Sequence, residues 1–170
     1  MTVPVLSIVG HSNAGKTTLL EKLVRHLAAQ GLRIATIKHS HHQPELDSPG
    51  KDSWRHKQAG AEASFLVGSA QMMMVADVKQ ELNPYMLANR FCAGFDLVLV
   101  EGYASLPGAK IEVLRAACGT GLRCHPTALL AVVSDLPDLL QPGLLQIGLD
   151  DIDGLADFIL NRMQQGGVYG

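Results

Sequence analysis

A phosphate-binding loop near the start of the chain constrains the fold more than any other feature of the sequence. Residues 10–17 match the pattern G-x-x-x-x-G-K-[ST] without interruption. An apolar run at residues 5–9 precedes the loop and an amphipathic stretch follows it, which is the strand and helix context that the motif needs. The backbone N–H groups of such a loop and the helix N-terminus form a cradle for a β-phosphate. The chain is therefore predicted to bind a nucleoside triphosphate.

The residue types in the loop assign a role to several positions. A glycine at position 15 lets the backbone approach the ligand closely, and the Lys16 ammonium is expected on the terminal phosphates. The hydroxyl group of Thr17 is expected to ligate Mg²⁺. The nucleotide-binding residues predicted from the motif are Gly10, His11, Ser12, Asn13, Ala14, Gly15, Lys16, Thr17 and Thr18.

Bulk composition limits the class of protein. A chain of 170 residues that is 47% hydrophobic and 18% charged is expected to form a globular fold, a single nucleotide-binding domain over residues 1–170. A net charge of -2 gives no general attraction to nucleic acid or anionic membrane, so neither is an expected partner. No apolar run is long enough to cross a bilayer, and the N-terminus leads directly into strand and loop, which predicts no signal peptide. Three cysteines predict a reducing cytoplasm and no disulfide scaffold.

Apolar runs alternate with amphipathic segments and predict an α/β fold, a P-loop NTPase-type layer sandwich with a mostly parallel central sheet. Two apolar segments, residues 63–67 and 71–76, flank Gly68-Ser69-Ala70 and are expected to form a β-hairpin. Strands are predicted at residues 5–9, 34–38, 96–101, 110–115 and 129–133, and helices at residues 17–30, 53–60, 82–91 and 151–163.

Two acidic residues are candidates to help Thr17 hold Mg²⁺. Glu101 ends the most apolar strand and is followed by Gly102, so it is expected at the edge of the sheet where ligands bind. Its alternative role is that of a surface acid at the end of a strand. Asp47 lies in the loop after the second strand, where an acid often reaches the water shell of the metal. A solvated loop aspartate is an equal alternative there.

The loop after the second strand is rich in histidine and basic residues, and three interpretations of it compete. The first is an anion site beside the nucleotide, the second a solvated polar loop, and the third a Zn²⁺ or Ni²⁺ site. Adjacent His41 and His42 diverge in an extended segment, and no cysteine or second histidine cluster completes a tetrahedral set, which counts against metal.

Base recognition does not follow from the residues. The Asn-Lys-x-Asp signature that many GTPases use to bind guanine is absent. Asp135 follows a predicted strand and is a candidate acceptor for a guanine edge. It is equally compatible with a turn residue or a helix cap.

Other segments are more specific than the phosphate loop, above all Asp47 and Pro49-Gly50-Lys51-Asp52-Ser53 after a histidine pair. Through these segments the sequence resembles the MobB family, the molybdopterin-guanine dinucleotide biosynthesis adaptor proteins, over nearly the whole chain. The remaining segments that carry the resemblance are 10–20, 37–42, Arg55, 59–61, 96–103, 110–112 and 154–158.

The resemblance implies a GTP-binding protein with weak hydrolysis that forms a homodimer. It further implies that the protein assists MobA, the transferase that joins GMP to molybdopterin. On this view the phosphorylated pterin or the partner enzyme contacts the basic loop, through His41, His42, Lys51, Asp52 and Arg55. The sequence departs from the family pattern at Gln43-Pro44, where an acid usually follows the histidine pair, and at Ala104-Ser105, where a Lys-His pair is common.

Two hypotheses from other classes remain open at this point. One is a metallochaperone GTPase, which shares the phosphate loop and a histidine-rich loop and would bind zinc or nickel through His41 and His42. The other is a small-molecule kinase or ATP-dependent ligase, which would show fast turnover with a small phosphate acceptor.

The predicted hairpin also bears on assembly. Its two apolar strands are expected to lie partly at an exposed edge, and such edges are paired or covered in stable proteins. Residues 72–74 are three methionines, which suit an adaptable buried interface. A two-fold homodimer built partly on the hairpin is therefore predicted, against the alternative that the hairpin is core within one monomer.

Overall fold

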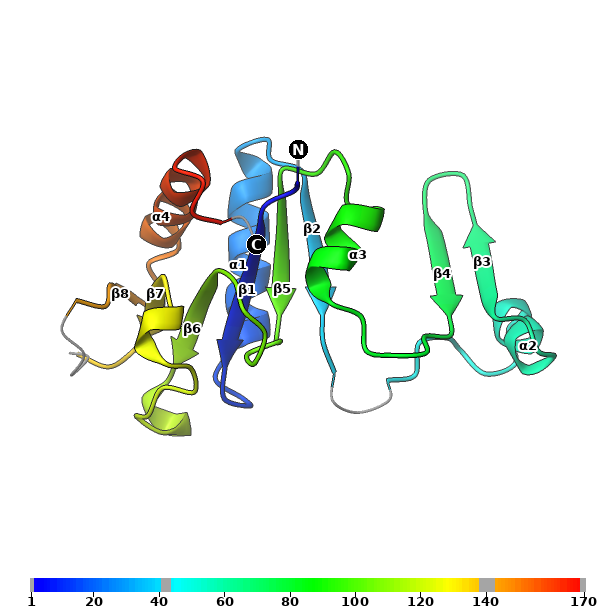
Figure 1. Cartoon of the computed structure of the whole chain (residues 1–170), viewed down its shortest axis with the longest axis horizontal. Coiled ribbons are helices and arrows are strands. Elements are labelled where there is room, and N and C mark those ends of the chain that lie inside the picture. Colours follow the sequence, from blue (N-terminus) through cyan, green and yellow to red (C-terminus); the bar gives the residue numbers. More distant parts are fainter. Residues whose placement is uncertain (1, 41–43, 138–142, 169–170) are drawn as a thin grey trace. The chain divides into compact units, whose positions relative to one another are not determined.

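The computed structural model describes residues 2–40, 44–137 and 143–168, and helices alternate with strands along most of the chain (Figure 1). Every helix and strand predicted above is present, with bounds that differ by two residues or fewer. The elements are β1 Val5–Gly10, α1 Lys16–Ala29, β2 Ile34–Lys38, α2 Asp52–Gln58, β3 Ala63–Val67, β4 Met72–Ala76, α3 Pro84–Phe91, β5 Leu97–Glu101, β6 Lys110–Leu114, η1 Ala116–Cys118, η2 Pro126–Ala128, β7 Ala131–Ser134, β8 Gln146–Gly148 and α4 Ile152–Gln164.

Six strands form one parallel sheet in the order β2-β5-β1-β6-β7-β8. The predicted α/β fold with a parallel sheet and a hairpin is confirmed. All six residues of β1 are buried, because the strand has neighbours on both sides and helices pack on the sheet. Strand β5 lies between β1 and β2, so the first two strands belong to one sheet without being neighbours.

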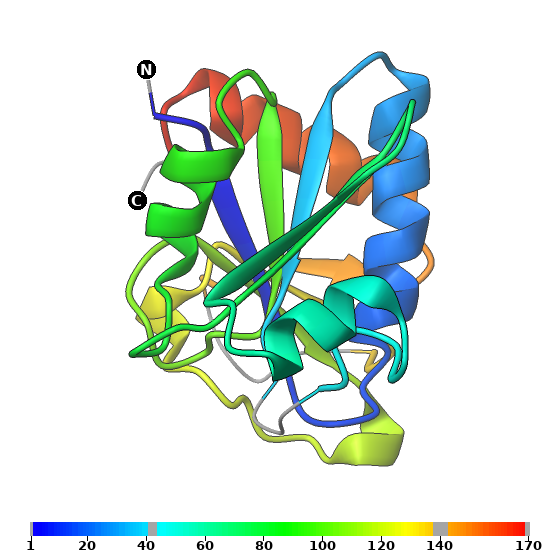
Figure 2. The ribbon, with the colours of Figure 1, turned by 90° about the vertical axis from the view of Figure 1, so that its right-hand side faces the viewer.

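Side chains that alternate along the strands pack against different helices. Leu97 and Leu99 of β5 belong to the cluster that includes the buried leucines of α1 and the inner face of α4. Val98 and Val100 point the other way and pack with Ala88 of α3. Figure 2 shows α1 and α3 on opposite sides of the sheet. Among the described residues, no helix is both long enough and apolar enough to cross a bilayer.

The chain falls into two compact units, one of residues 1–39 with 83–170 and the other of residues 40–82. The second unit contains α2 and the antiparallel pair β3–β4, which is the predicted hairpin. Its register pairs Phe65 with Met74 and Leu66 with Met73. A single nucleotide-binding domain over residues 1–170 stays a prediction.

Gly10 ends β1 at a point where no larger residue fits. Its φ angle is +140°, and a Cβ atom there would clash with the carbonyl oxygen of Val113 on β6. Gly31, at the end of α1, also has a positive φ of +89°, but a Cβ atom there would meet nothing within 4 Å. Of these two glycines, Gly10 alone combines a positive φ with a close approach to a neighbouring strand.

We expect Gly10→Ala to lower the free energy of unfolding by about 3 kcal/mol, since backbone strain and overpacking each cost about 1–3 kcal/mol. Gly31→Ala is the matched control and should show only the strain. Urea denaturation of both variants measures the difference. Equal losses in the two variants would show that the contact with Val113 contributes nothing.

Candidate functional site

The carboxyl ends of several parallel strands meet at one edge of the sheet. Glu101, the last residue of β5, pairs with Ile8 of β1 on one side and with Lys38 of β2 on the other. Strand β1 ends at Gly10, the first residue of the phosphate loop, and α1 begins at Lys16 within the motif. Ligands of open α/β sheets bind at this edge. The loop therefore lies where the motif predicts it, next to the ends of β2 and β5.

The backbone of the phosphate loop is left-handed at three points. Gly10, Asn13 and Gly15 have φ angles of +140°, +63° and +91°. Glycine adopts this region freely and asparagine tolerates it, which allows a tight loop whose N–H groups converge. Gly15 is the N-cap of α1, and in the described structure no side chain caps this helix and its first turn contains no acid. The first N–H groups of α1 are therefore available to an anion.

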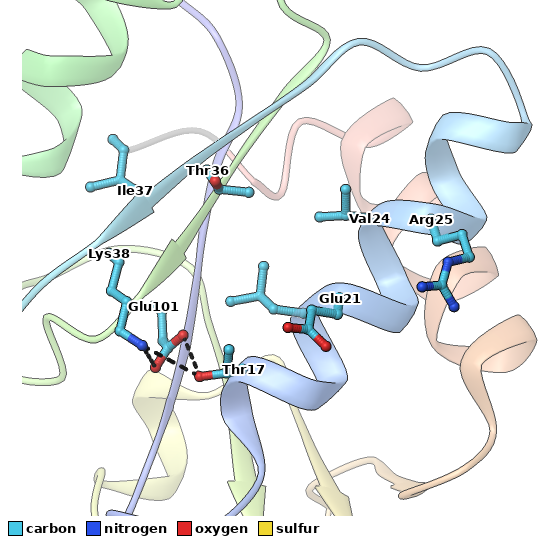
Figure 3. A pocket seen from close by; sticks show the side chains of 9 residues that line it. Thr17, Glu21, Val24, Arg25, Thr36, Ile37, Lys38 and Glu101 are labelled. Atoms are coloured by element: carbon cyan, nitrogen blue, oxygen red, sulfur yellow. Dashed lines mark hydrogen bonds and ion pairs between the residues drawn. The ribbon is translucent and has the colours of Figure 1, made fainter. Parts of the chain in front are cut away.

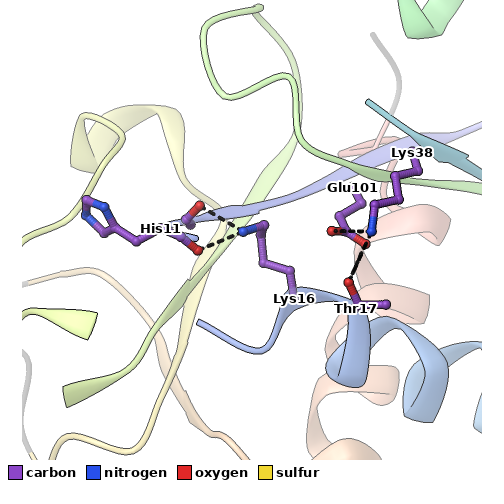
Figure 4. A network of polar contacts seen from close by, with 6 residues as sticks. His11, Lys16, Thr17, Lys38 and Glu101 are labelled. Carbon is purple, nitrogen blue, oxygen red and sulfur yellow. Dashed lines mark hydrogen bonds and ion pairs between the residues drawn. The ribbon is translucent and has the colours of Figure 1, made fainter. Parts of the chain in front are cut away.

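The ammonium group of Lys16 lies over the start of the loop (Figure 4). Its Nζ atom donates to the carbonyl oxygen of Gly10 at 3.1 Å and to that of His11 at 2.7 Å. Burial lowers the pKa of Lys16 from the ordinary lysine value, and the charges of Arg123 and Lys38 lower it further, whereas Glu101 opposes them. These carbonyl contacts leave the positive charge of Lys16 without a direct carboxylate partner among the described residues.

Glu101 joins two elements that are distant in sequence. Its Oε2 atom accepts a hydrogen bond from the Thr17 hydroxyl at 2.9 Å, and its Oε1 atom lies 3.3 Å from the Lys38 ammonium (Figures 3 and 4). Lys38 also lies 3.5 Å from the Thr17 hydroxyl oxygen. The structure thus brings together Thr17 and Glu101, two of the three predicted metal ligands. A hydroxyl and a carboxylate that already hold a cationic group form a donor set that fits Mg²⁺.

A cavity of about 480 Å³ opens beside this group, between α1 and β2 (Figure 3). Thr17, Lys38 and Glu101 form its polar end. The rest of its wall is largely aliphatic and is formed by Leu20, Val24, Thr36, Ile37 and the stems of Glu21 and Arg25.

The third predicted metal ligand, Asp47, lies in the second unit. Its Oδ1 atom accepts a hydrogen bond from the Ser48 backbone N–H at 2.8 Å, and its Oδ2 atom is buried with no partner among the described residues. Asp47, Lys51 and Asp52 line a separate cavity of about 600 Å³ whose wall includes Leu66 and Met73 of the hairpin. Whether Asp47 reaches the metal stays a prediction.

Of the five residues predicted to contact an anion or a partner, three lie in the described structure and two do not. Lys51 precedes α2, and Asp52 is the first residue of that helix. Arg55 follows one turn later, with its Nη1 atom 3.7 Å from Asp52 Oδ1. His41 and His42 lie outside the described residues. Within the described part of the chain, no group of three or more histidine, cysteine, aspartate or glutamate side chains could hold a metal ion.

Asp135 follows β7 at the same edge of the sheet as the phosphate loop. Its Oδ1 atom accepts a hydrogen bond from the Ala116 N–H at 2.8 Å, and its Oδ2 atom lies 3.5 Å from Arg115 Nε. The carboxylate therefore ties the end of β7 to the segment that follows β6. Its role toward a guanine base stays a prediction.

Two residues beside the loop were missed by sequence reasoning. Glu112 is fully buried in β6, and its carboxylate accepts hydrogen bonds from the backbone N–H groups of Arg123 and Cys124 at 2.5 and 2.9 Å. Arg123 in turn reaches the carbonyl oxygen of Gly10, with its Nη1 atom at 3.5 Å. The available signal was an acid in the middle of an otherwise apolar strand, Ile111-Glu112-Val113.

The sequence model of the family described as Molybdopterin guanine dinucleotide synthesis protein B matches residues 5–135. The chain belongs to this MobB family. The resemblance predicted from the sequence is thereby confirmed.

Relatives and solved structures of the family cover nearly the whole chain. The molybdopterin-guanine dinucleotide biosynthesis adapter protein of Escherichia coli K12 is 40% identical, over 96% of this chain and 95% of the relative. The protein of the same name from Haemophilus influenzae is 39% identical, over 94% and 89% of the two chains. The crystal structure of Bacillus subtilis MobB superposes with a TM-score of 0.76 at 26% identity, over 94% of this chain and 97% of that one.

We expect Glu112→Ala to lower the free energy of unfolding by about 2–4 kcal/mol, because two backbone N–H donors then lose their buried acceptor. Glu21→Ala removes an acid from the exposed surface of α1 and is the matched control, with an expected change within about 0.5 kcal/mol. Chemical denaturation measures both. A stability equal to wild type for Glu112→Ala would show that the carboxylate does not hold residues 123–124.

Proposed function

We propose that this chain is a GTP-binding adapter in the biosynthesis of molybdopterin guanine dinucleotide, acting in the cytoplasm together with a MobA-type guanylyltransferase. The observation that carries the proposal is the phosphate loop with Lys16 at its centre and Thr17 bonded to Glu101. Family membership supplies the pathway, since the relatives are named as adapter proteins of this biosynthesis. The three cysteines are free thiols, which fits a reducing compartment.

The nucleotide would be GTP, and its hydrolysis slow. Guanine is favoured because the relatives serve the synthesis of a guanine dinucleotide. Residues that position an attacking water include a glutamine in well-known GTPases, and here Tyr103 and Ala104 follow Glu101-Gly102 instead. The protein would therefore act mainly by binding the nucleotide and assisting the partner enzyme.

The metal would be Mg²⁺, held by the Thr17 hydroxyl and by phosphate oxygens of the nucleotide. Glu101 would act on it directly or through a water molecule, since Mg²⁺ keeps several waters in such sites. Asp47 remains a proposed further ligand. When Mg²⁺ binds, it would compete with the Lys38 ammonium for the oxygens of Glu101 and Thr17.

The cavity of the second unit would contact the pterin or the transferase. Lys51 provides a positive charge beside an apolar wall of Leu66 and Met73, which suits a phosphorylated ring system or an acidic and apolar protein segment. Asp52 lies in the same cavity, and Arg55 lies one helical turn further along α2. Together with His41 and His42, these residues are the proposed contacts.

Lys16→Ala should weaken GTP binding by about 2–4 kcal/mol, the value of a charge-assisted pair of hydrogen bonds to phosphate. Titration calorimetry with GTP and ATP measures this and gives the base preference. Lys22→Ala is the matched control, because Lys22 lies on the same helix in an exposed ion pair with Asp150. GTP affinity unchanged in Lys16→Ala would remove the nucleotide-binding claim.

Glu101→Gln keeps the shape of the side chain and removes its charge, so GTP binding should lose most of its dependence on Mg²⁺. Glu21→Gln is the control, since Glu21 lines the same cavity without contacting Thr17. Titration of GTP at several Mg²⁺ concentrations gives the dependence for each variant. The assignment of Glu101 to the metal fails if its variant behaves like that of Glu21.

A homodimer is the proposed assembly, because one face of the hairpin is apolar and exposed. The register of β3 with β4 places Phe65, Val67, Met72 and Met74 on the same face, with exposed fractions of 59, 71, 69 and 39%. Apolar faces of this kind on soluble chains usually mark an interface. A second copy of the chain, with two-fold symmetry, would cover the face.

Phe65→Glu should convert the dimer into a monomer at micromolar concentration, because it places a charge on the apolar face. Val78→Glu is the control, since Val78 is 56% exposed and lies outside the hairpin strands. Sedimentation velocity separates the two states. A wild-type protein that sediments as a monomer would refute the dimer.

A further inference from the structure

We propose that Arg123 is a second phosphate-binding side chain of the nucleotide site and contacts the terminal phosphate of the bound triphosphate. Glu112 acts as the positioning residue that holds the backbone of Arg123 in place. The inference rests on the proposed nucleotide-binding function and goes beyond the motif, which ends at residue 17.

Arg123 and Lys16 converge on one atom at the start of the phosphate loop. The carbonyl oxygen of Gly10 lies 3.1 Å from Lys16 Nζ and 3.5 Å from Arg123 Nη1. Lys16 is the lysine that the motif places on the β- and γ-phosphates. A guanidinium group that shares its acceptor is therefore within a few ångströms of the same phosphates.

The backbone that carries Arg123 is anchored to the sheet. Both carboxylate oxygens of Glu112 are used, Oε1 by the N–H of Arg123 and Oε2 by the N–H of Cys124. Glu112 pairs in register with Val9 of β1, one residue before the phosphate loop. A second tie joins the same segment to the loop itself, since His11 Nε2 lies 3.3 Å from the carbonyl oxygen of Gly121. Residues 121–124 are thus fixed at both ends beside the loop.

Two cations at this edge, Lys16 and Arg123, have no carboxylate partner among the described residues, which favours an anionic ligand. Among the described residues, the Arg123 guanidinium has no carboxylate within ion-pair distance, and the side chain is exposed. Arg115, the other arginine near the loop, is already paired with Asp135. Lys16, Lys38 and Arg123 contribute three positive charges, and Glu101 is paired with Lys38. The planar fork of an arginine fits phosphate oxygens with two parallel hydrogen bonds.

Titration calorimetry of Arg123→Ala with GTP and with GDP tests the proposal. We expect GTP affinity to fall by about 10-fold or more, as for the loss of a charged hydrogen bond, while GDP affinity changes by less than about threefold. Arg90→Ala is the control, since it removes the same charge from the end of α3, where the guanidinium lies 5.3 Å from the Phe91 ring centroid. Arg123→Lys keeps the charge without the fork and should lose part of the GTP affinity.

The possible results separate this inference from the proposed function. GTP affinity unchanged in Arg123→Ala, or equal losses for GTP and GDP, overturns the contact with the terminal phosphate. If Lys16→Ala still weakens GTP binding in that case, the nucleotide site stands and only the inference falls. A wild-type chain that binds no GTP overturns both. If thermal melting shows that Arg123→Ala is unfolded, Arg123→Lys takes its place in the test. Wild-type GTP affinity in Arg123→Lys would then refute the two parallel hydrogen bonds from Arg123 to the terminal phosphate.

Discussion

The parallel pairing of β1 with β5 on one side and β6 on the other determines how the first unit is built. Strand β1 is buried along its whole length, and at its carboxyl end Gly10 leads into the phosphate loop. The same register fixes the neighbours of that end. Glu101 ends β5 opposite Ile8, and Glu112 of β6 lies opposite Val9. One acid therefore faces Thr17, and the other anchors the segment that carries Arg123.

Three cations, Lys16, Lys38 and Arg123, lie near one another at the edge of the sheet that carries the phosphate loop. Like charges about 4 Å apart repel by roughly 1 kcal/mol in water and by about 4 kcal/mol near a protein surface. The pKa of Lys16 is lowered by burial first and then by Arg123 and Lys38, which means that the protonated form is disfavoured. A polyphosphate at this place would remove the repulsion and raise the pKa again. Affinity for it should therefore be strongest below the pKa of Lys16 and weaken as the pH rises through that value.

Much of the fold followed from the sequence because its signals are local. The glycine loop between an apolar run and an amphipathic helix specified β1 and α1, and the turn at Gly68 specified the hairpin. The insertion of β5 between β1 and β2 did not follow, since strand order depends on contacts between distant segments. Strand β8 was missed because three residues, Gln146–Gly148, are too few to show a periodicity.

In the candidate site, too, the residues within local sequence patterns were predictable, and those placed by contacts between distant segments were not. Lys16 and Thr17 were predictable from a contiguous motif, and Glu101 from its place at the end of an apolar run. Arg123 was not, because its position depends on hydrogen bonds from the N–H groups of residues 123 and 124 to Glu112, a buried acid on a different segment. Asp135 was predicted either to accept from a guanine edge or to act as a turn residue or helix cap, and the structure shows a different contact, a bond from the N–H of Ala116, 19 residues earlier in the chain. Its role toward guanine depends on a ligand contact that no local pattern encodes.

The central claim is that this chain assists synthesis of the guanine dinucleotide through a nucleotide bound at its phosphate loop. The most direct measurement is the amount of molybdopterin guanine dinucleotide that a MobA-type transferase forms from molybdopterin and Mg²⁺-GTP, with and without this chain. The account predicts that the wild-type chain increases the product and that Lys16→Ala, folded and at equal concentration, does not. Equal stimulation by the two chains, or none by the wild type, would contradict it.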